Sequence, residues 1–258
     1  MKLPFRVSLW PLYVTAPALL QGGKASEVHG VKWIEMAKLP DLEAEKAILL
    51  KHVADQAAET ASYLGADVLD SRVIAALGAV RREAFLPEQL KIRAYDNRPQ
   101  PIGHGQTISQ PYIVAAMSHL LQIPEEAKVL EIGTGCGYQS AVLAEFAAEV
   151  VSVERISKLA FAARDRLASQ GYVNVSIHEG DGWQGWPEEA PYDGIIVTAA
   201  APRLPQPLVA QLKPGGRLVI PIGGRLAGQK LMVFEKALDG SLVESCGLPV
   251  AFVPLVEG

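Results

Sequence analysis

The sequence predicts an α/β fold, in which a doubly wound, mostly parallel sheet with an antiparallel edge follows a helical N-terminal segment. From Lys128 onwards, short apolar runs alternate with stretches of helical spacing. Continuous apolar runs are typical of parallel strands that are buried on both faces. Towards the end of the chain, two further runs are joined through Asp239-Gly240, a hairpin signal that predicts the antiparallel edge.

The chain before Lys128 is predicted to be mainly helical. An apolar face runs from Leu42 to Leu64, and apolar residues recur at helical spacing from Ser71 to Val80. Another helix is expected to begin at Pro111, because proline is favoured in the first turn. The loop from Pro99 to Gly105 is so rich in turn formers that we expect no regular element there.

The chain after Lys128 supplies the sheet and its covering helices. Helices are expected over residues 138–148, 157–169 and 205–212, the last of them closed by residues 213–216. The strands are expected at Val129 to Ile132, Val150 to Val153, Val175 to His178, Gly194 to Thr198, Arg217 to Ile222, Lys230 to Lys236 and about Leu242 to Val253.

These patterns divide the chain into an extension and one domain. Residues 1–40 are interpreted as an N-terminal extension, and residues 41–258 as a single domain. Within the domain, residues 41–100 form the helical part, residues 101–127 a loop and a helix, and residues 128–258 the α/β core.

The extension has three open interpretations: a flexible segment, a signal peptide, or sequence upstream of a true start at Met36. Two basic residues precede an apolar stretch at 7–20 and a small-residue site at 23–25, as in a secretory signal peptide. Pro11 and Pro17 interrupt that stretch, which is too short to span a bilayer.

Composition excludes several classes of protein. With 49% hydrophobic residues in 258, the chain can bury a core without disulfide or metal staples. Its formal charge of −4 argues against a nucleic-acid-binding surface. The two cysteines, Cys136 and Cys246, lack metal-ligand spacing, so no metal site is expected. Arg81 and Arg82 are interpreted as part of a solvated face.

The glycine turn after the first strand predicts a cofactor site. An apolar run ends at Glu131, and Gly133, Gly135 and Gly137 then lead into a helix. A dinucleotide fingerprint would place its third glycine at position 138, where the chain has Tyr138. Glu131 would also repel a pyrophosphate, whereas S-adenosylmethionine carries two cationic groups and no phosphate. The turn therefore favours S-adenosylmethionine.

Acids at the ends of the next strands strengthen this prediction. Glu154 could accept hydrogen bonds from both ribose hydroxyls, and Asp181, followed by Gly182, could accept one from the adenine amino group. Thr198 is expected in the floor of the pocket. The alternatives are a helix-initiating acid or an ion pair with Arg155 for Glu154, and an Asp-Gly turn for Asp181.

Residues 101–111, Pro-Ile-Gly-His-Gly-Gln-Thr-Ile-Ser-Gln-Pro, resemble the signature loop of the protein-L-isoaspartate (D-aspartate) O-methyltransferase family. The resemblance extends through Gly180 to Trp186 and to residues 252–255, and covers the chain from about Ser71 to its end. It implies a fold of the S-adenosylmethionine-dependent methyltransferase type. It also implies a repair enzyme that methylates the free α-carboxyl of L-isoaspartyl residues in damaged proteins and peptides.

The same resemblance implies the residues on the acceptor side. Ser109 corresponds to the family's active-site serine, and the segments around it imply that Ile102, Gly103, His104, Thr107, Val253 and Leu255 hold the isoaspartyl peptide. We expect Ser109 to position the carboxylate by a hydrogen bond. Taken alone, Ser109 would be interpreted as the cap of the helix that begins near Pro111.

Other functions stay open at the level of sequence: a methyltransferase for a small molecule or RNA, a nicotinamide-dependent oxidoreductase, and a binding module without turnover. We expect a cytoplasmic protein, because S-adenosylmethionine is a cytosolic metabolite. We also expect a monomer that binds neither nucleic acid nor membranes. An exported protein is the alternative if the first 25 residues are a signal peptide.

Overall fold

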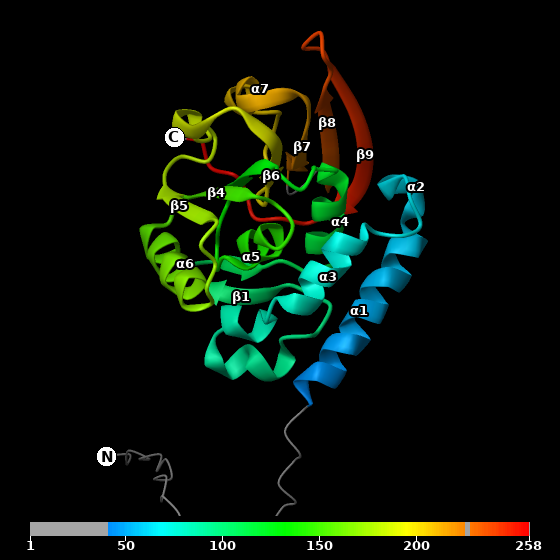
Figure 1. Ribbon diagram of the computed structural model, residues 1–258, viewed down its shortest axis with the longest axis vertical. Coiled ribbons are helices and arrows are strands. Elements are labelled where there is room, and N and C mark those ends of the chain that lie inside the picture. Colours follow the sequence, from blue (N-terminus) through cyan, green and yellow to red (C-terminus); the bar gives the residue numbers. More distant parts are fainter. Residues whose placement is uncertain (1–40, 225–227, 258) are drawn as a thin grey trace, which may run out of the picture. The chain divides into compact units, whose positions relative to one another are not determined.

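The computed structural model describes residues 41–224 and 228–257, and these residues confirm the predicted fold class (Figure 1). A seven-stranded sheet has the order β5-β4-β3-β6-β7-β8-β9, and β1 and β2 form a separate two-stranded sheet. The strands are β1 Gln100–Gly103, β2 Gln106–Ile108, β3 Lys128–Ile132, β4 Glu149–Glu154, β5 Val175–Glu179, β6 Tyr192–Val197, β7 Leu212–Gly224, β8 Gly228–Lys236 and β9 Leu242–Val250.

Helices precede and separate these strands. The α-helices are α1 Leu42–Glu59, α2 Ala61–Leu64, α3 Ser71–Ala79, α4 Pro111–Leu121, α5 Tyr138–Ala144, α6 Ser157–Ser169 and α7 Gln206–Gln211, and the 3₁₀ turns are η1 Arg82–Phe85, η2 Glu88–Arg93 and η3 Pro187–Glu189. The helices predicted before residue 128 are therefore present, although the first breaks at Thr60 into α1 and α2.

The sheet reverses its strand order between β3 and β6. From β3 the chain moves outwards through β4 to β5, and it then returns to pair β6 with the other side of β3. The pairings among β3 to β7 are parallel, whereas β8 and β9 add antiparallel strands at one edge, as predicted. Ligands of open α/β sheets bind beyond the carboxyl ends of the strands at such a reversal, so the fold puts the site beside β3 and β6.

Two apolar clusters cover the two faces of the sheet. Neighbouring residues of β3 belong to different clusters: Val129 packs with α4, α5 and α6, and Leu130 packs with α7 and Trp183. This separation follows from the period of two residues along a strand. The strands read as continuous apolar runs because both of their faces are buried.

Two expectations about irregular segments were wrong. The loop from Pro99 to Gly105 forms most of a hairpin, in which Pro101 pairs with Thr107. Its turn formers lie at the tip, where Gly103, His104 and Gly105 all have positive φ, and its flanks stay extended. Residues 213–216, expected to close a helix, lie inside β7, which begins at Leu212 and has an irregular register against β6.

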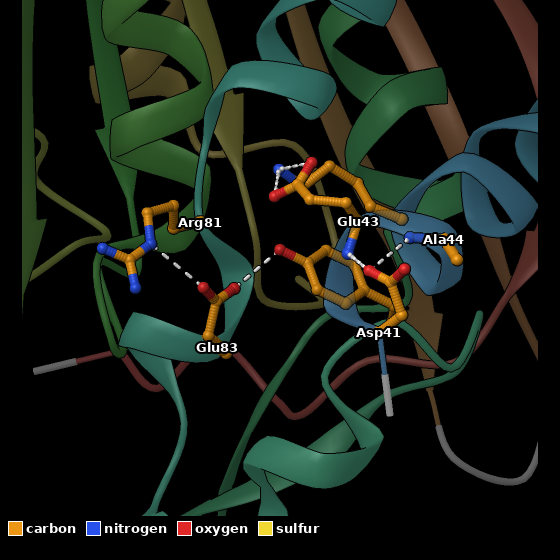
Figure 2. A network of polar contacts seen from close by, with 7 residues as sticks. Asp41, Glu43, Ala44, Arg81 and Glu83 are labelled. Carbon is orange, nitrogen blue, oxygen red and sulfur yellow. Dashed lines mark hydrogen bonds and ion pairs between the residues drawn. The ribbon is translucent and has the colours of Figure 1, made fainter. Parts of the chain in front are cut away.

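The start of α1 is held by a polar network, shown in Figure 2. Asp41 caps the helix, because its carboxylate accepts hydrogen bonds from the backbone amides of Glu43 and Ala44 at 3.2 and 3.3 Å. Beside it, Arg81 Nε donates to Glu83 Oε1 at 3.0 Å (Figure 2). Tyr95 donates to the other oxygen of Glu83 at 2.6 Å. Burial would raise the pKa of Glu83, but these hydrogen bonds outweigh it and lower that pKa.

Interpretations of residues 1–40 concern a part of the chain outside the described residues. Within the described ranges, no helix is both long enough and apolar enough to cross a bilayer.

Candidate active site

A cavity lies at the carboxyl ends of β3, β4 and β6, where the reversal of strand order predicts one. It is lined from these strand ends, from the segment 106–109 and from the C-terminal segment. Among the residues on its wall are Gly133, Gly135, Glu154, Gly182, Thr198 and Ser109. Most of the cofactor residues predicted from the sequence therefore meet around one cavity.

Gly133 makes the close approach of β3 and β6 possible. It has φ +95°, and a Cβ added there would lie 2.5 Å from Thr198 Oγ1. The Thr198 hydroxyl lies 2.7 Å from the carbonyl oxygen of Gly133 and 3.0 Å from that of Ile132, and donates to them. A side chain at position 133 would displace this hydroxyl, so the glycine serves the packing of the protein as well as the cavity.

Gly135 and Gly137 turn the chain from β3 into α5. Both have positive φ, +56° and +89°, a conformation that favours glycine. Gly137 is the N-cap of α5, and a Cβ there would meet Leu167 of α6 at 3.1 Å. The turn is thus shaped by the neighbouring helix as well as by the cavity that Gly133 and Gly135 line.

Glu154 fixes the second side of the cavity. Its Oε2 accepts from the Gly135 amide and its Oε1 from the Ile156 amide, both at 2.8 Å. Each carboxylate oxygen can accept a further hydrogen bond, so this wall residue is held in place and can still bind a hydroxyl group. Its contact with the Ile156 amide, just before α6, therefore does not exclude the predicted contact with a ligand.

Glu131 lies beneath the glycine turn and does not line the cavity. It is fully buried, and its Oε2 accepts from Ser152 at 2.7 Å and from Ser140. The other oxygen, Oε1, has no partner among the described residues. Burial raises the pKa of this carboxyl to about 7, although the two serine hydroxyls oppose the rise. Its negative charge, when present, acts on the cavity from behind the turn.

Asp181 and Gly182 form the third part of the predicted cofactor site. Asp181 Oδ1 accepts from the amide of Trp183 at 3.0 Å, which is the local turn expected of an Asp-Gly pair. Gly182 lines the cavity, and a Cβ at this position would lie 2.4 Å from Ile132 Cγ2. Asp181 itself is not among the residues that line the cavity.

A second cavity, of about 670 Å³, adjoins the first. Four residues line both: Thr107, Ser109, Thr198 and Val253. Ser109 does not cap α4, because the N-cap of that helix is Gln110 and no side chain caps it. Its hydroxyl has no hydrogen-bond partner among the described residues, so it can bond a group that lies between the two cavities.

The other residues predicted to hold a peptide are spread more widely. Ile102 packs over the glycine turn, with its Cδ1 3.4 Å from where a Cβ of Gly135 would lie. Gly103 and His104 are exposed at the tip of the β1–β2 hairpin and line neither of the two cavities. Leu255 lines the first cavity only. Of the predicted set, Thr107 and Val253 therefore lie nearest to Ser109.

Arg82 was interpreted as a solvated residue, and the structure shows the opposite. Its side chain is 0% exposed. The guanidinium donates from Nη2 to the carbonyl oxygen of Ser109 at 2.8 Å and from Nε to that of Ala94 at 2.9 Å. It also lies 4.7 Å from the ring centroid of Tyr138. Burial lowers the pKa of this guanidinium. Arg82 therefore fixes the backbone at Ser109, whereas Arg81 is 67% exposed, as expected.

Several residues that line the second cavity were not predicted, and those furthest from Ser109 along the N-terminal part of the chain are Gln56, Thr60 and Tyr63, from α1 and the start of α2. Their sequence context gives no signal, because they lie in an ordinary amphipathic helix about fifty residues before Ser109. Among the described residues, no group of three or more His, Cys, Asp or Glu could hold a metal ion.

Comparison with known proteins identifies the relatives of this chain. Residues 64–258 match the family model of protein-L-isoaspartate(D-aspartate) O-methyltransferase. A protein-L-isoaspartate O-methyltransferase 2 of Syntrophobacter fumaroxidans is 50% identical over 215 residues, which cover 83% of this chain and 87% of that protein. One of Polaromonas sp. is 51% identical over 207 residues, or 80% of this chain and 98% of that protein.

Solved structures show the same fold. A structure of protein-L-isoaspartate O-methyltransferase superposes with a TM-score of 0.69 at 29% identity, over 83% of this chain and 66% of that chain. A putative protein-L-isoaspartate O-methyltransferase from Plasmodium falciparum, in complex with S-adenosyl-L-homocysteine, gives a TM-score of 0.68 at 24% identity. It covers 83% of this chain and 99% of that chain.

Proposed function

Since this chain belongs to the protein-L-isoaspartate(D-aspartate) O-methyltransferase family, we propose that its first cavity holds the cofactor and its second the acceptor. The protein is an S-adenosylmethionine-dependent repair methyltransferase for the free α-carboxyl of L-isoaspartyl residues in damaged proteins. Residues of the first cavity would bind the methyl donor, and residues of the second cavity would bind the acceptor.

The residues of the first cavity fit S-adenosylmethionine. Gly133, Gly135 and Gly182 line it without side chains that would fill it. Glu154 offers unused lone pairs to the ribose hydroxyls, and Glu131, when it is ionised, adds negative charge behind the turn, which favours a cationic ligand. Thr198 closes the floor. When bound, S-adenosylmethionine would supply an electrophilic methyl group for transfer to a carboxylate oxygen.

The acceptor needs no general base. An α-carboxyl has an ordinary pKa of about 3.5, so it is already an anion at neutral pH. The protein's task is to align one oxygen and to remove its water shell. Proximity and orientation contribute up to about 7–11 kcal/mol in the best intramolecular cases. Ser109 is suited to this task, because its free hydroxyl can donate to one carboxylate oxygen while the other oxygen attacks.

The observation that carries this assignment is the shared wall. Ser109, Thr107 and Val253 line both cavities, so a carboxylate that Ser109 binds from the second cavity faces the first. Arg82 supports the arrangement by holding the carbonyl oxygen of Ser109. Thr107 and Val253 flank the serine and exclude water from the reacting oxygen.

The test compares two synthetic peptides that differ only in whether the acidic residue is L-isoaspartyl or L-aspartyl. We expect transfer of labelled methyl groups from S-adenosylmethionine to the isoaspartyl peptide and none above background to its twin. Equal labelling of both peptides, or of neither, would contradict the proposal. Labelling of RNA or of a small molecule in place of the peptide would assign the enzyme to another acceptor class.

We also propose that residues 41–258 form the methyltransferase domain and that the protein acts as a cytoplasmic monomer. In support, the described residues belong to one compact unit, and S-adenosylmethionine is made and used in the cytosol. Sedimentation of the full chain would test the oligomeric state. Mass spectrometry of the mature N-terminus would test whether residues 1–25 are removed as a signal peptide.

A further inference from the structure

The second cavity extends from Ser109 to the helical segment α1–α2, well beyond the space that a carboxylate needs. Gln56, Thr60 and Tyr63 form the wall on this side, and residues 248–253 form the wall that faces them. The elements lie close together in the fold, since α1 packs on α4 and α2 contacts β9 (Figure 1). The family model matches only from residue 64, so these three residues lie outside the part of the chain that it matches.

The α1–α2 wall is fixed relative to Ser109 by hydrogen bonds over long sequence distances. The Thr60 hydroxyl donates to the carbonyl oxygen of Gln56 at 2.8 Å, which leaves its lone pairs to accept from the hydroxyl of Tyr112. Tyr112 lies in the first turn of α4, three residues after Ser109, and is buried. The wall and the serine are thus attached to the same turn of helix.

The hydrogen-bond network also decides the orientation of the Gln56 amide. The backbone amide of Tyr112 donates to Asn97 Oδ1 at 3.0 Å, so the side-chain nitrogen of Asn97 is a donor. That nitrogen donates to Gln56 Oε1 at 3.0 Å, and Gln110 Nε2 donates to the same oxygen at 3.2 Å. The Oε1 of Gln56 is therefore an acceptor, and its NH₂ group has no partner among the described residues. It is a fixed donor on the cavity wall.

Tyr63 adds an apolar surface beside this donor. The residue is 40% exposed, and its hydroxyl has no partner among the described residues. A free amide donor next to an exposed aromatic ring is suited to an extended polypeptide, because the donor can bind a main-chain carbonyl while the ring packs on a side chain.

We propose that the α1–α2 wall reads the polypeptide next to the isoaspartyl residue, with Gln56 donating to a main-chain carbonyl and Tyr63 packing on a flanking side chain. The proposal rests on the function proposed above, since it presumes that an isoaspartyl carboxylate lies at Ser109. It makes Gln56 and Tyr63 specificity-determining residues for peptide acceptors. They bind the part of the substrate that does not react.

The test uses two acceptors with the full-length enzyme. One is a peptide with several residues on each side of L-isoaspartate. The other is N-acetyl-L-aspartic acid β-methylamide, which keeps the free α-carboxyl and has no flanking residue. We expect the ratio of kcat/KM for the long acceptor to that for the short one to fall about tenfold in Tyr63→Ala, with affinity for S-adenosylhomocysteine as in the parent enzyme.

Gln56→Glu tests the donor separately. A glutamate keeps the oxygen that accepts from Asn97 and Gln110 but loses the NH₂ group. Its added charge acts on both acceptors, so the ratio of the two kcat/KM values is the quantity to compare. We expect this ratio to fall severalfold. Phe161→Ala, which removes an exposed ring of α6 that lines neither cavity, is the matched control and should leave the ratio unchanged.

The outcomes distinguish failure of the proposed function from failure of the proposed role of the α1–α2 wall. If the parent enzyme methylates neither acceptor, the proposed function fails. If it methylates both and the ratio is unchanged in Tyr63→Ala and Gln56→Glu, the α1–α2 wall does not read the peptide. Equal losses on both acceptors would also overturn the proposal, because residues that merely support Ser109 would affect the two acceptors alike.

Discussion

The cofactor side and the acceptor side of this enzyme are built in different ways. On the cofactor side, the key residues follow the ends of successive strands of one sheet, and the backbone of adjacent strand ends holds them: Glu154 accepts from the amides of Gly135 and Ile156, and Thr198 donates to the carbonyl oxygen of Gly133. On the acceptor side, α1, the β1–β2 hairpin, the start of α4 and the C-terminal segment meet around one cavity.

The acceptor side is therefore held by side-chain contacts between elements that the seven-stranded sheet does not bring together. Arg82 reaches the carbonyl oxygen of Ser109, Asn97 links Gln56 to Tyr112, and Thr60 bonds Tyr112. The difference shows why one half of the site has a compact sequence motif and the other is spread along the chain. The sheet brings strand ends together for any sequence of this topology, whereas each contact of the acceptor side depends on particular side chains.

The largest expected effect concerns the buried acid of the cofactor side, Glu131. Its pKa is raised from 4.5 to about 7. A carboxyl whose pKa is raised by folding stabilises the protein fully below the unfolded value, and this contribution is lost as the pH rises through the folded value. Between about pH 4.5 and 7, the unfolding free energy of the parent protein should therefore decrease by up to about 3 kcal/mol more than that of Glu131→Gln.

Denaturant unfolding of both proteins across this pH range measures the difference. Glu126→Gln, which changes an exposed acid near the same strand, is the control. Parallel stability curves for the parent and Glu131→Gln would show that the buried carboxyl does not titrate in this range.

The second effect tests the cofactor side alone, through the affinity for S-adenosylhomocysteine. Glu154→Ala removes the carboxylate that holds the Gly135 amide and that we propose binds the ribose. Affinity for S-adenosylhomocysteine should fall roughly 100-fold, which corresponds to about 3 kcal/mol for lost charged hydrogen bonds. Calorimetric titration measures this affinity. Glu179→Ala, at the exposed end of β5, is the control and should bind normally. An unchanged affinity would remove Glu154 from the cofactor site.

The third effect concerns the acceptor side, where turnover should change and cofactor binding should not. Ser109→Ala removes the hydroxyl proposed to position the carboxylate, so kcat should fall about 30-fold, or about 2 kcal/mol. Binding of S-adenosylhomocysteine should change less than twofold, since Ser109 acts on the acceptor. Ser169→Ala, on the exposed surface of α6, is the control. A parallel loss of cofactor binding would contradict the positioning role.

The smallest effect tests whether a distant residue sets the acceptor geometry. Arg82→Lys keeps a basic side chain, but one amine cannot reproduce the fork of hydrogen bonds from the guanidinium to Ala94 and Ser109. We expect kcat to fall about tenfold, or about 1.4 kcal/mol, with little change in cofactor affinity. Arg81→Lys, at the exposed neighbour, is the control. Equal losses in kcat and in cofactor affinity would indicate a general loss of structure.

Much of the fold could be predicted because its signals are local. The apolar runs predicted β3 to β9, and Asp239-Gly240 predicted the β8–β9 hairpin. The β1–β2 hairpin was missed because its proline and glycine residues suggest a loop, although those at the tip support the turn. Arg82 was missed because charge favours the surface in general, and only its partners, three carbonyl oxygens and the ring of Tyr138, make burial tolerable.

The sequence by itself therefore determined the α/β class, the glycine turn at 133–137 and the acids at the strand ends, because strand period, turn chemistry and the end of a strand are properties of neighbouring residues. Only the tertiary structure decided that Glu131 lies behind the turn, that Arg82 holds Ser109, and that Gln56 and Tyr63 line the same cavity as the serine. Those relations depend on how helices and sheet pack, and packing joins residues that no local pattern connects.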